Sequence, residues 1–277
     1  MSVLDPVLPA VAYAIGLFQA DGSHEGSVEG KGRISLELAI RDQKILLRLS
    51  KTLPCYVSIG YRTRNTNFAE EYHSAVLRLY DRDIRRQFAN FGVTVGRKSE
   101  TIRPPDCPFA EPDYVRGLLD GDGSVGFTRK GEPFVGFVTV SEASADYYCQ
   151  MVRRVCGVTR TPGRNQRDGS FNIVLLNQAA AQLAQWAWYS PDVLGIERKL
   201  VSARKVAAWA PPSEKAGRYG AARAPWTAAD DQIVMTHRQS EAAQILGRTI
   251  SSVSVRRWRL RKLETLSDAA GVVGSAD

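Results

Sequence analysis

Histidine and cysteine are scarce in this sequence, with three histidines and four cysteines among 277 residues. The cysteines form no Cys-x-x-Cys pair, and His24, His73 and His237 lie far apart along the chain. A structural zinc site needs several such ligands at short spacings, and a disulfide scaffold needs a much higher density of cysteine. The sequence therefore argues against both.

Long apolar runs are also missing. The apolar stretch at residues 7–18 is too short for a bilayer-spanning helix, which takes about 20 residues, and no basic segment precedes it as in a secretory signal. The apolar and charged fractions, 44% and 24%, are those of globular proteins. We therefore expect a soluble cytoplasmic protein without membrane contact. Its length predicts two or three folded units, since one domain usually takes about 100–200 residues.

Basic side chains are concentrated near the C-terminus. Residues 1–201 contain 25 basic and 22 acidic side chains, residues 202–263 contain 12 and 4, and the last 14 residues contain three acids. The overall charge of +8 therefore marks a separate basic unit, which favours a polyanionic partner. The segment 210–225 carries three prolines and no apolar periodicity, which is typical of a linker.

An internal repeat relates two parts of the chain. Residues 13–23 read YAIGLFQADGS, and residues 114–124 read YVRGLLDGDGS. The same offset of 101 carries Cys55 to Cys156 and the pair 97–98 to the pair 198–199. A constant register at both ends predicts two similar halves of about a hundred residues each. Periodicity within the halves predicts an αββαββα order in both.

The first helix of each half carries small residues four apart and ends in Asp-Gly. Gly16 and Ala20 form this stripe in one helix, and Gly117 and Gly121 form it in the other. Two such stripes allow close helix packing, which would bring Asp21 and Asp122 side by side. Adjacent carboxylates attract a hard divalent cation, and a metal shared in this way suits phosphodiester hydrolysis. The pattern also fits two tightly packed helices that bind no metal.

The segments AIGLFQADGS and VRGLLDGDGS resemble two copies of the LAGLIDADG motif of homing endonucleases, in the single-chain form. The resemblance covers about residues 8–205. It implies two four-stranded antiparallel sheets that form a saddle over DNA, with Asp21 and Asp122 as metal ligands, and Mg²⁺ (or Mn²⁺) as the cofactor. The backbone carbonyls of Ala20 and Gly121 would be auxiliary ligands. Gln19 departs from the acidic residue that the family often has there.

The resemblance also implies a catalytic role for Lys98 and Lys199, which lie 101 residues apart like the aspartates. They resemble the basic residues that flank the cleavage centre in the family. Lysine is mostly exposed in any fold, so two ordinary surface lysines near helix starts are the alternative.

Polar residues alternate with apolar ones along the predicted strands, and they form a candidate DNA-reading surface. Arginine reads guanine and asparagine reads adenine, although a solvated sheet face shows the same alternation. In the first half the candidates are Arg33, Ser35, Glu37, Ser58, Arg62, Arg64, Ser74 and Arg78. In the second half they are Arg160, Arg164, Asn165, Arg167, Ser170 and Asn172.

The basic C-terminal segment resembles Myb/SANT-like helix-turn-helix domains over about residues 225–263. An acidic helix start at residues 226–231 is followed by a short helix that stops at Gly247, and by a third helix rich in arginine. A small basic interaction module of three helices is the alternative. The candidate DNA-binding residues of this segment are Arg248, Ser251, Ser252, Arg256 and Arg257.

We therefore predict an α+β fold with two pseudo-symmetric αββαββα halves and a small all-α helix-turn-helix domain. The expected boundaries are 1–105 and 106–205 for the halves, 206–224 for a linker, 225–265 for the helical domain and 266–277 for a disordered tail.

The predicted function is site-specific cleavage of double-stranded DNA by a monomer, in a Mg²⁺-dependent reaction of the intron-homing type that leaves 3′ overhangs. No small-molecule substrate is expected. Two alternatives remain. WhiA-type regulators join a LAGLIDADG-like region to a helix-turn-helix and do not cleave, and some members of the family assist RNA splicing as maturases.

Overall fold

The computed structural model describes residues 4–66, 69–211 and 226–271. The chain divides into two compact units, residues 1–219 and 220–277. None of the helices in the described ranges is both long and apolar enough to cross a membrane.

The first half of the larger unit has the predicted order of elements. In chain order these are α1 (Pro9–Asp21), β1 (Gly22–Gly26), β2 (Gly32–Ala39), η1 (Ile40–Asp42), α2 (Gln43–Thr52), β3 (Val57–Thr66), β4 (Ala69–Leu79) and α3 (Arg82–Asn90). The strands form one antiparallel sheet in the order β1-β2-β4-β3.

The second half repeats the arrangement with one strand fewer. Its elements are α4 (Glu111–Asp122), β5 (Gly123–Phe127), β6 (Pro133–Thr139), α5 (Glu142–Cys156), β7 (Phe171–Leu176), α6 (Asn177–Ala187) and α7 (Glu197–Ala207). The sheet is antiparallel in the order β5-β6-β7.

The prediction of a fourth strand in the second half was wrong. Residues 158–170, which lie between α5 and β7, form no strand and make only the isolated bridge Arg164–Phe171. This segment contains Pro162, Gly163 and Gly169 and has no apolar alternation. Proline cannot donate to a strand ladder, and glycine weakens a strand, so the segment stays irregular.

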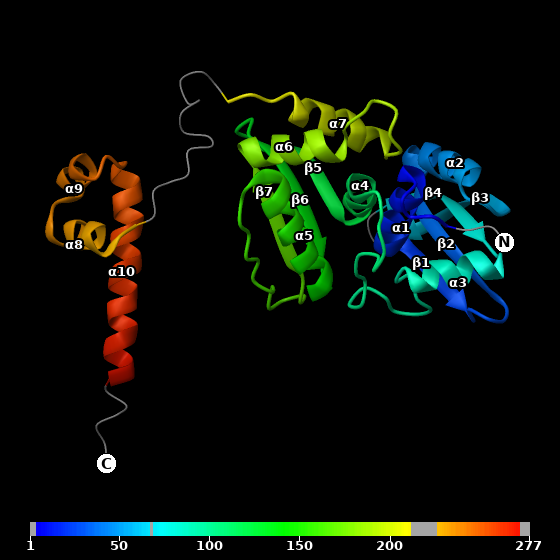
Figure 1. The fold of residues 1–277 in the computed structure, drawn as a ribbon, viewed down its shortest axis with the longest axis horizontal. Helices are drawn as coiled ribbons and strands as arrows, with labels where there is room; N and C mark the ends of the chain where they lie inside the picture. Colours follow the sequence, from blue (N-terminus) through cyan, green and yellow to red (C-terminus); the bar gives the residue numbers. More distant parts are fainter. Residues whose placement is uncertain (1–3, 67–68, 212–225, 272–277) are drawn as a thin grey trace, which may run out of the picture. The chain divides into compact units, whose positions relative to one another are not determined.

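The two halves share one apolar core. The inward faces of the sheets carry Ile34, Leu36 and Leu77 in the first half and Val135, Phe137 and Ile173 in the second, all at most 1% exposed. These residues belong to a single buried cluster that also contains most of α1 and α4. Figure 1 shows α1 and α4 together between the two sheets. The halves are therefore one folded body built around this helix pair.

Ion pairs on the surface also join the halves. Asp42, at the start of α2, accepts from the guanidinium of Arg198 on α7 at 3.0 and 3.1 Å. Lys44 donates to Glu197 at 2.7 Å. Because Arg198 precedes Lys199, these contacts fix the start of the helix that carries one of the predicted catalytic lysines.

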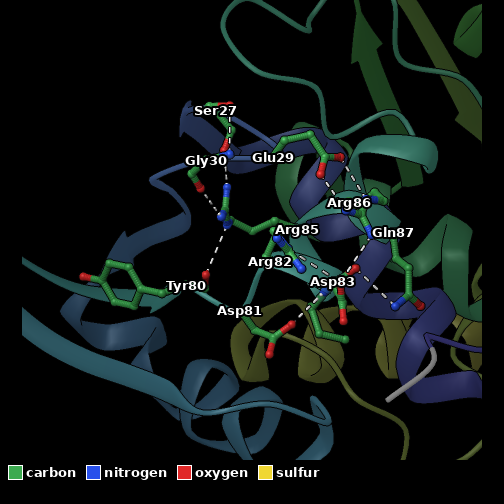
Figure 2. A network of polar contacts seen from close by, with 11 residues as sticks. Ser27, Glu29, Gly30, Tyr80, Asp81, Arg82, Asp83, Arg85, Arg86 and Gln87 are labelled. Atoms are coloured by element: carbon green, nitrogen blue, oxygen red, sulfur yellow. Dashed lines mark hydrogen bonds and ion pairs between the residues drawn. The ribbon is translucent and has the colours of Figure 1, made fainter. Parts of the chain in front are cut away.

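An arginine pair on α3 holds the turn between β1 and β2 (Figure 2). Arg86 binds Glu29 through two contacts of 2.5 and 2.9 Å. The buried guanidinium of Arg85 donates to three backbone carbonyls, those of Ser27, Gly30 and Tyr80. The hairpin that follows Asp21 is thus anchored to a helix at its far end.

The smaller unit is a three-helix domain with its own core. It contains α8 (Ala228–Thr236), α9 (Gln239–Ile245) and α10 (Ile250–Gly271). Thr227 caps α8 in a capping box with Asp230, and Gly247 adopts a positive φ of 58° where α9 gives way to α10. The core consists of Val234, Ala242, Ala243 and Val253.

Two predicted boundaries differ from these elements. α10 continues to Gly271, past residue 266, where the disordered tail was expected to begin, because residues 262–270 are mostly good helix formers such as leucine, lysine, glutamate and alanine. α7 ends at Ala207, so it enters the segment predicted as linker from residue 206. Most of that linker, residues 212–224, lies outside the described part, as do residue 225 and the last six residues.

Candidate functional site

The site begins with the close packing of α1 and α4. A Cβ atom added to Gly16 would lie 2.2 Å from the backbone oxygen of Tyr114, and one added to Gly117 would lie 2.3 Å from that of Tyr13. No real Cβ fits at such distances. The stripe of small residues predicted from the sequence is therefore confirmed as the contact, and both helices run in the same direction because Gly121 meets Ala20 at their ends.

Replacing Gly117 by alanine is expected to lower the free energy of unfolding by about 3 kcal/mol, the upper part of the range for overpacking. The added methyl group must push apart two backbones that touch. Chemical denaturation measures the change. The matched control is Gly163→Ala, because nothing lies within 4 Å of a Cβ at that position. Equal stability of the two variants would contradict the packing argument.

Asp21 and Asp122 are the last residues of the paired helices, and each is followed at once by a strand. The Asp21 carboxylate lies over the neighbouring helix, with an oxygen 3.3 Å from the position of a Cβ on Gly121. Both side chains are exposed. Partial desolvation and the charge of Asp21 raise the pKa of Asp122 to about 6. Partial desolvation also raises the pKa of Asp21, against the opposing effect of Lys199 and Lys98.

This pKa makes the stability of the metal-free protein depend on pH. The folded Asp122 holds its proton more tightly than the unfolded chain does, so its protonation stabilises the fold at low pH. That contribution is lost as the pH rises from about 4 through about 6. The wild type should therefore lose Tm relative to Asp122→Asn as the pH rises from 4 to 7. Calorimetry of both proteins in EDTA measures this difference. A Tm difference that is constant over this range would contradict the assignment.

Lys98 and Lys199 are buried, with 7% of each residue exposed, so the alternative of ordinary surface lysines is wrong. The Lys98 ammonium donates to the carbonyls of Gln19 and Ala20 at 2.6 and 3.1 Å. The Lys199 ammonium donates at 2.7–2.8 Å to three carbonyls, those of Leu119, Asp120 and Gly123. Each lysine therefore neutralises the carbonyl end of one helix, directly behind an aspartate.

The residues present fit a divalent cation. Desolvation and the repulsion from Asp21 raise the pKa of Asp122, and a divalent cation would relieve that repulsion. The carboxylates and the nearby backbone carbonyls all offer oxygen, the ligand atom that hard divalent cations prefer. The carbonyls of Ala20 and Gly121, predicted as auxiliary ligands, accept from Lys98 at 3.1 Å and from Lys199 at 3.5 Å. A carbonyl has a second lone pair, so these contacts leave room for a cation. Within the described residues no group of three or more acidic, histidine or cysteine side chains forms a metal site.

A pair of cross-helix tyrosines, not predicted as functional, supports the site. The Tyr13 hydroxyl donates to Asp120 at 2.7 Å, and the Tyr114 hydroxyl donates to Gln19 at 2.6 Å. Gln19 and Asp120 are at most 2% exposed and lie two residues before the exposed carboxylates. Gln19 and Asp120 therefore make equivalent hydrogen bonds that join α1 to α4, although one is an amide and the other an acid. The repeat offset of 101 residues relates Tyr13 to Tyr114, and it is the feature of the sequence that could have identified this pair.

The structure brings the predicted reading residues of the first half onto one face. Pairing places Ser35 and Ser58 on either side of Arg78, and Arg62 beside Ser74. Glu37 accepts from Ser74 at 2.6 Å and pairs with the guanidinium groups of Arg62 and Arg64 at 3.2 and 3.1 Å. Arg33 pairs with Glu25 at 2.7 Å. This face therefore carries hydrogen-bonding groups, several of them in ion pairs, but Ser35 and Ser74 are buried.

The predicted reading residues of the second half are not arranged in the same way. Only Asn172 lies on a strand, β7, where it is exposed. Arg160, Arg164, Asn165, Arg167 and Ser170 belong to the irregular segment at 158–170. Arg160 donates to the Val174 carbonyl at 3.3 Å, and Arg164 donates to the Gly169 carbonyl at 3.0 Å. These arginines border β7 instead of lying in a row across the sheet.

Three of the predicted DNA-binding arginines in the smaller unit make contacts within it. Arg256 holds Asp231 through two contacts of 2.6 Å, and Arg257 donates to the Val234 carbonyl at 2.7 Å. The guanidinium of Arg248 lies 4.0 Å from the ring centroid of Trp226. Ser251 is exposed and Ser252 is half-buried at the start of α10.

The sequence matches no protein-family model and no curated protein. Solved structures are similar in fold. The homing endonuclease I-WcaI bound to its DNA recognition sequence has a TM-score of 0.52 at 10% identity, over 72% of this chain and 88% of that one.

Two further structures have lower scores. The LAGLIDADG homing endonuclease I-LtrWI bound to target DNA has a TM-score of 0.45 at 8% identity, over 72% of this chain and 88% of that one. The meganuclease I-SmaMI bound to uncleavable DNA has a TM-score of 0.45 at 11% identity, over 73% of this chain and 90% of that one. The fold assignment therefore rests on I-WcaI. It confirms the predicted α+β class, and over the part covered this chain has the fold of a homing endonuclease.

Proposed function

We propose that this protein is a site-specific DNA endonuclease that uses a divalent cation. The observation that carries the proposal is the pair of exposed carboxylates, Asp21 and Asp122, at the ends of two touching helices between two antiparallel sheets. A sheet face can follow the major groove of duplex DNA. The carboxylates then lie where two such faces meet, which is where a phosphodiester would be cut. The fold shared with I-WcaI, a homing endonuclease bound to its DNA recognition sequence, agrees with this function.

The residues of the chain divide the chemistry between them. Asp21 and Asp122 hold the cation, with the carbonyls of Ala20 and Gly121 as further oxygen ligands. A bound Mg²⁺ (or Mn²⁺) supplies an activated water and stabilises charge on the leaving oxygen. Lys98 and Lys199 lower the pKa of both carboxylates, against the effect of desolvation, and hold the helix ends in position.

Cleavage of both strands by a monomer follows from the internal repeat. Each half contributes one aspartate, one lysine and one sheet, so a single chain already carries two equivalent sets of groups. We propose that the two strand cuts are related by the pseudo-twofold symmetry of the halves and leave 3′ overhangs, as the resemblance to the LAGLIDADG family implies. The candidate reading residues of the first sheet would contact one half of the target, and those of the second half would contact the other.

The smaller unit would add affinity for DNA that depends little on sequence. Residues 250–262 of this unit carry five basic and no acidic side chains, while residues 1–201 are nearly balanced. Its core is separate from that of the larger unit, so removing it leaves the other core intact. We propose that it is a helix-turn-helix domain that contacts DNA through Ser251 and Ser252 at the start of α10, while Arg256 and Arg257 hold α10 against α8.

A chain that ends at residue 211 should therefore bind DNA with a weaker dependence on salt. The logarithm of the binding constant falls by about 0.9 per neutralised phosphate for each unit of log salt concentration. If the smaller unit contacts about three phosphates, the slope should shrink by about 3 units. Titrations of full-length and shortened chains on one duplex measure this, and an unchanged slope would contradict the assignment.

The direct experiment is incubation of the full chain with a large pool of random duplexes in Mg²⁺, followed by sequencing of cut ends. Enrichment of one cut sequence supports the endonuclease. Enrichment of one bound sequence without any cut, in Mg²⁺ or Mn²⁺, would show a binding protein instead.

A further inference from the structure

The outward faces of the two sheets carry side chains at equivalent positions. These side chains are mostly polar in the first sheet and mostly apolar in the second. In the first sheet Gly22 pairs with Leu36 and Ser23 with Ser35. In the second sheet Gly123 pairs with Phe137 and Ser124 with Gly136. Every partner is shifted by 101 residues, so the correspondence along β2 and β6 follows from strand register. Arg33, Ser35 and Glu37 thus correspond to Phe134, Gly136 and Val138.

The next strand shows the same replacement. Arg78 lies opposite Ser35 in the first sheet, and Val174 lies opposite Gly136 in the second. Leu176 lies opposite Phe134. Val138, Val174 and Leu176 are 42%, 38% and 41% exposed. We call Phe134, Val138, Val174 and Leu176 the apolar face. It stands where the first sheet carries its charged, hydrogen-bonding groups.

This apolar face has the same relation to the carboxylates as its polar counterpart. In both halves the outward face begins with a serine two residues after the aspartate, Ser23 in β1 and Ser124 in β5. A duplex that lies across Asp21 and Asp122 and meets the first face would therefore also meet the second. Contiguous exposed apolar side chains are uncommon on a soluble protein unless they contact a partner.

The border of the apolar face indicates a polyanion. Arg160 is held beside β7 by its contact with the Val174 carbonyl. Asn172 is exposed opposite Val138. Duplex DNA combines phosphates with one apolar group in its major groove, the 5-methyl group of thymine.

We propose that the second sheet recognises thymine 5-methyl groups through the apolar face, while the first sheet recognises hydrogen-bonding base edges. The two halves of the DNA target are then recognised through different base features, and the half contacted by β6 and β7 is rich in thymine. The inference rests on the proposed function, because it assigns a specificity to the same DNA-binding surface.

Uracil substitution tests the proposal, since it removes only the methyl group from thymine. Duplexes are first selected from a random pool by the full chain in Ca²⁺, and thymine is then replaced by uracil in one half of the selected site at a time. Burial of one methyl group is worth about a fourfold change in binding constant. We expect about fourfold weaker binding per contacted thymine in one half and little change in the other.

Threonine variants identify which protein face reads the methyl groups. The double variant Val138→Thr/Val174→Thr keeps the branched shape and the strand propensity but adds hydroxyls. Its binding should no longer distinguish thymine from uracil in the sensitive half. The control Val201→Thr changes an exposed valine on α7 and should leave the distinction at its wild-type value. Thermal unfolding confirms that each variant is folded.

The outcomes separate this inference from the function it rests on. If no sequence is enriched by selection, the proposed DNA function fails and the methyl inference fails with it. If a sequence is enriched but uracil has no effect in either half, or if the threonine variant keeps the full uracil effect, only the inference is overturned. A dimer of the wild type that the threonine variant abolishes, with the uracil effect unchanged, would instead make the apolar face an interface between two copies.

Discussion

Asp21→Asn and Asp122→Asn should each reduce the rate of DNA cleavage in Mg²⁺ by about a thousandfold or more. Each substitution removes one of the two carboxylates proposed to hold the cation. The catalytic contribution of a metal is several kcal/mol, and each 1.36 kcal/mol is a factor of about ten in rate. Single-turnover cleavage of a selected duplex measures the effect.

Binding of the same duplex should survive both substitutions, because the amide is nearly the same size and removes a negative charge from beneath the phosphates. The matched control is Glu142→Gln, which neutralises an exposed acid at the start of α5. It should cleave at the wild-type rate. If Asp21→Asn cleaved DNA within tenfold of the wild-type rate, the proposed role of Asp21 in holding the cation would be wrong.

Lys199→Met should shift the pH dependence of cleavage as well as lower the rate. The Lys199 ammonium lowers the pKa of both aspartates, so its loss raises these pKa values and leaves less carboxylate at neutral pH. Each unit by which the pKa lies above the working pH costs about a factor of ten in ionised carboxylate. We expect a loss of at least about tenfold at pH 7 that is partly recovered at pH 9.

The variants at position 199 separate charge from structure. Methionine also leaves buried carbonyls of α4 without their donor, which costs about 1–3 kcal/mol of stability. Lys199→Arg keeps the charge and should keep the wild-type pH profile even if the larger group disturbs packing. Lys205→Met, on the exposed side of the same helix, is the control and should behave as the wild type. A loss of activity that is equal at every pH would leave Lys199 a purely structural role.

The sequence predicted most of the larger unit because its repeat carries physical information. An offset shared by glycines, aspartates and lysines predicted two halves, and the small residues at four-residue spacing predicted that Gly16 and Gly117 would touch. Asp-Gly after each helix placed both carboxylates at the helix ends. These features are local in the chain, so periodicity and spacing reveal them.

Other features depend on tertiary contacts that spacing does not reveal. Lys98 and Lys199 look like surface residues in the sequence, and only the fold shows that they turn inward to meet the carbonyl ends of α1 and α4. The arginines of α10 look free for DNA, yet Arg256 and Arg257 bind acidic and carbonyl groups of α8 and its C-terminal end. The αββαββα order predicted a fourth strand in the second half, but residues 158–170 contain a proline and two glycines and form none.

Sequencing of both cut ends from the duplex pool, with Mg²⁺ and with EDTA, tests the central claim most directly. The account predicts staggered cuts in both strands at one enriched sequence, with 3′ overhangs, in Mg²⁺ only and only when Asp21 and Asp122 are both present. Cuts that persist in EDTA, or that the Asp21→Asn/Asp122→Asn double variant still makes, would contradict it.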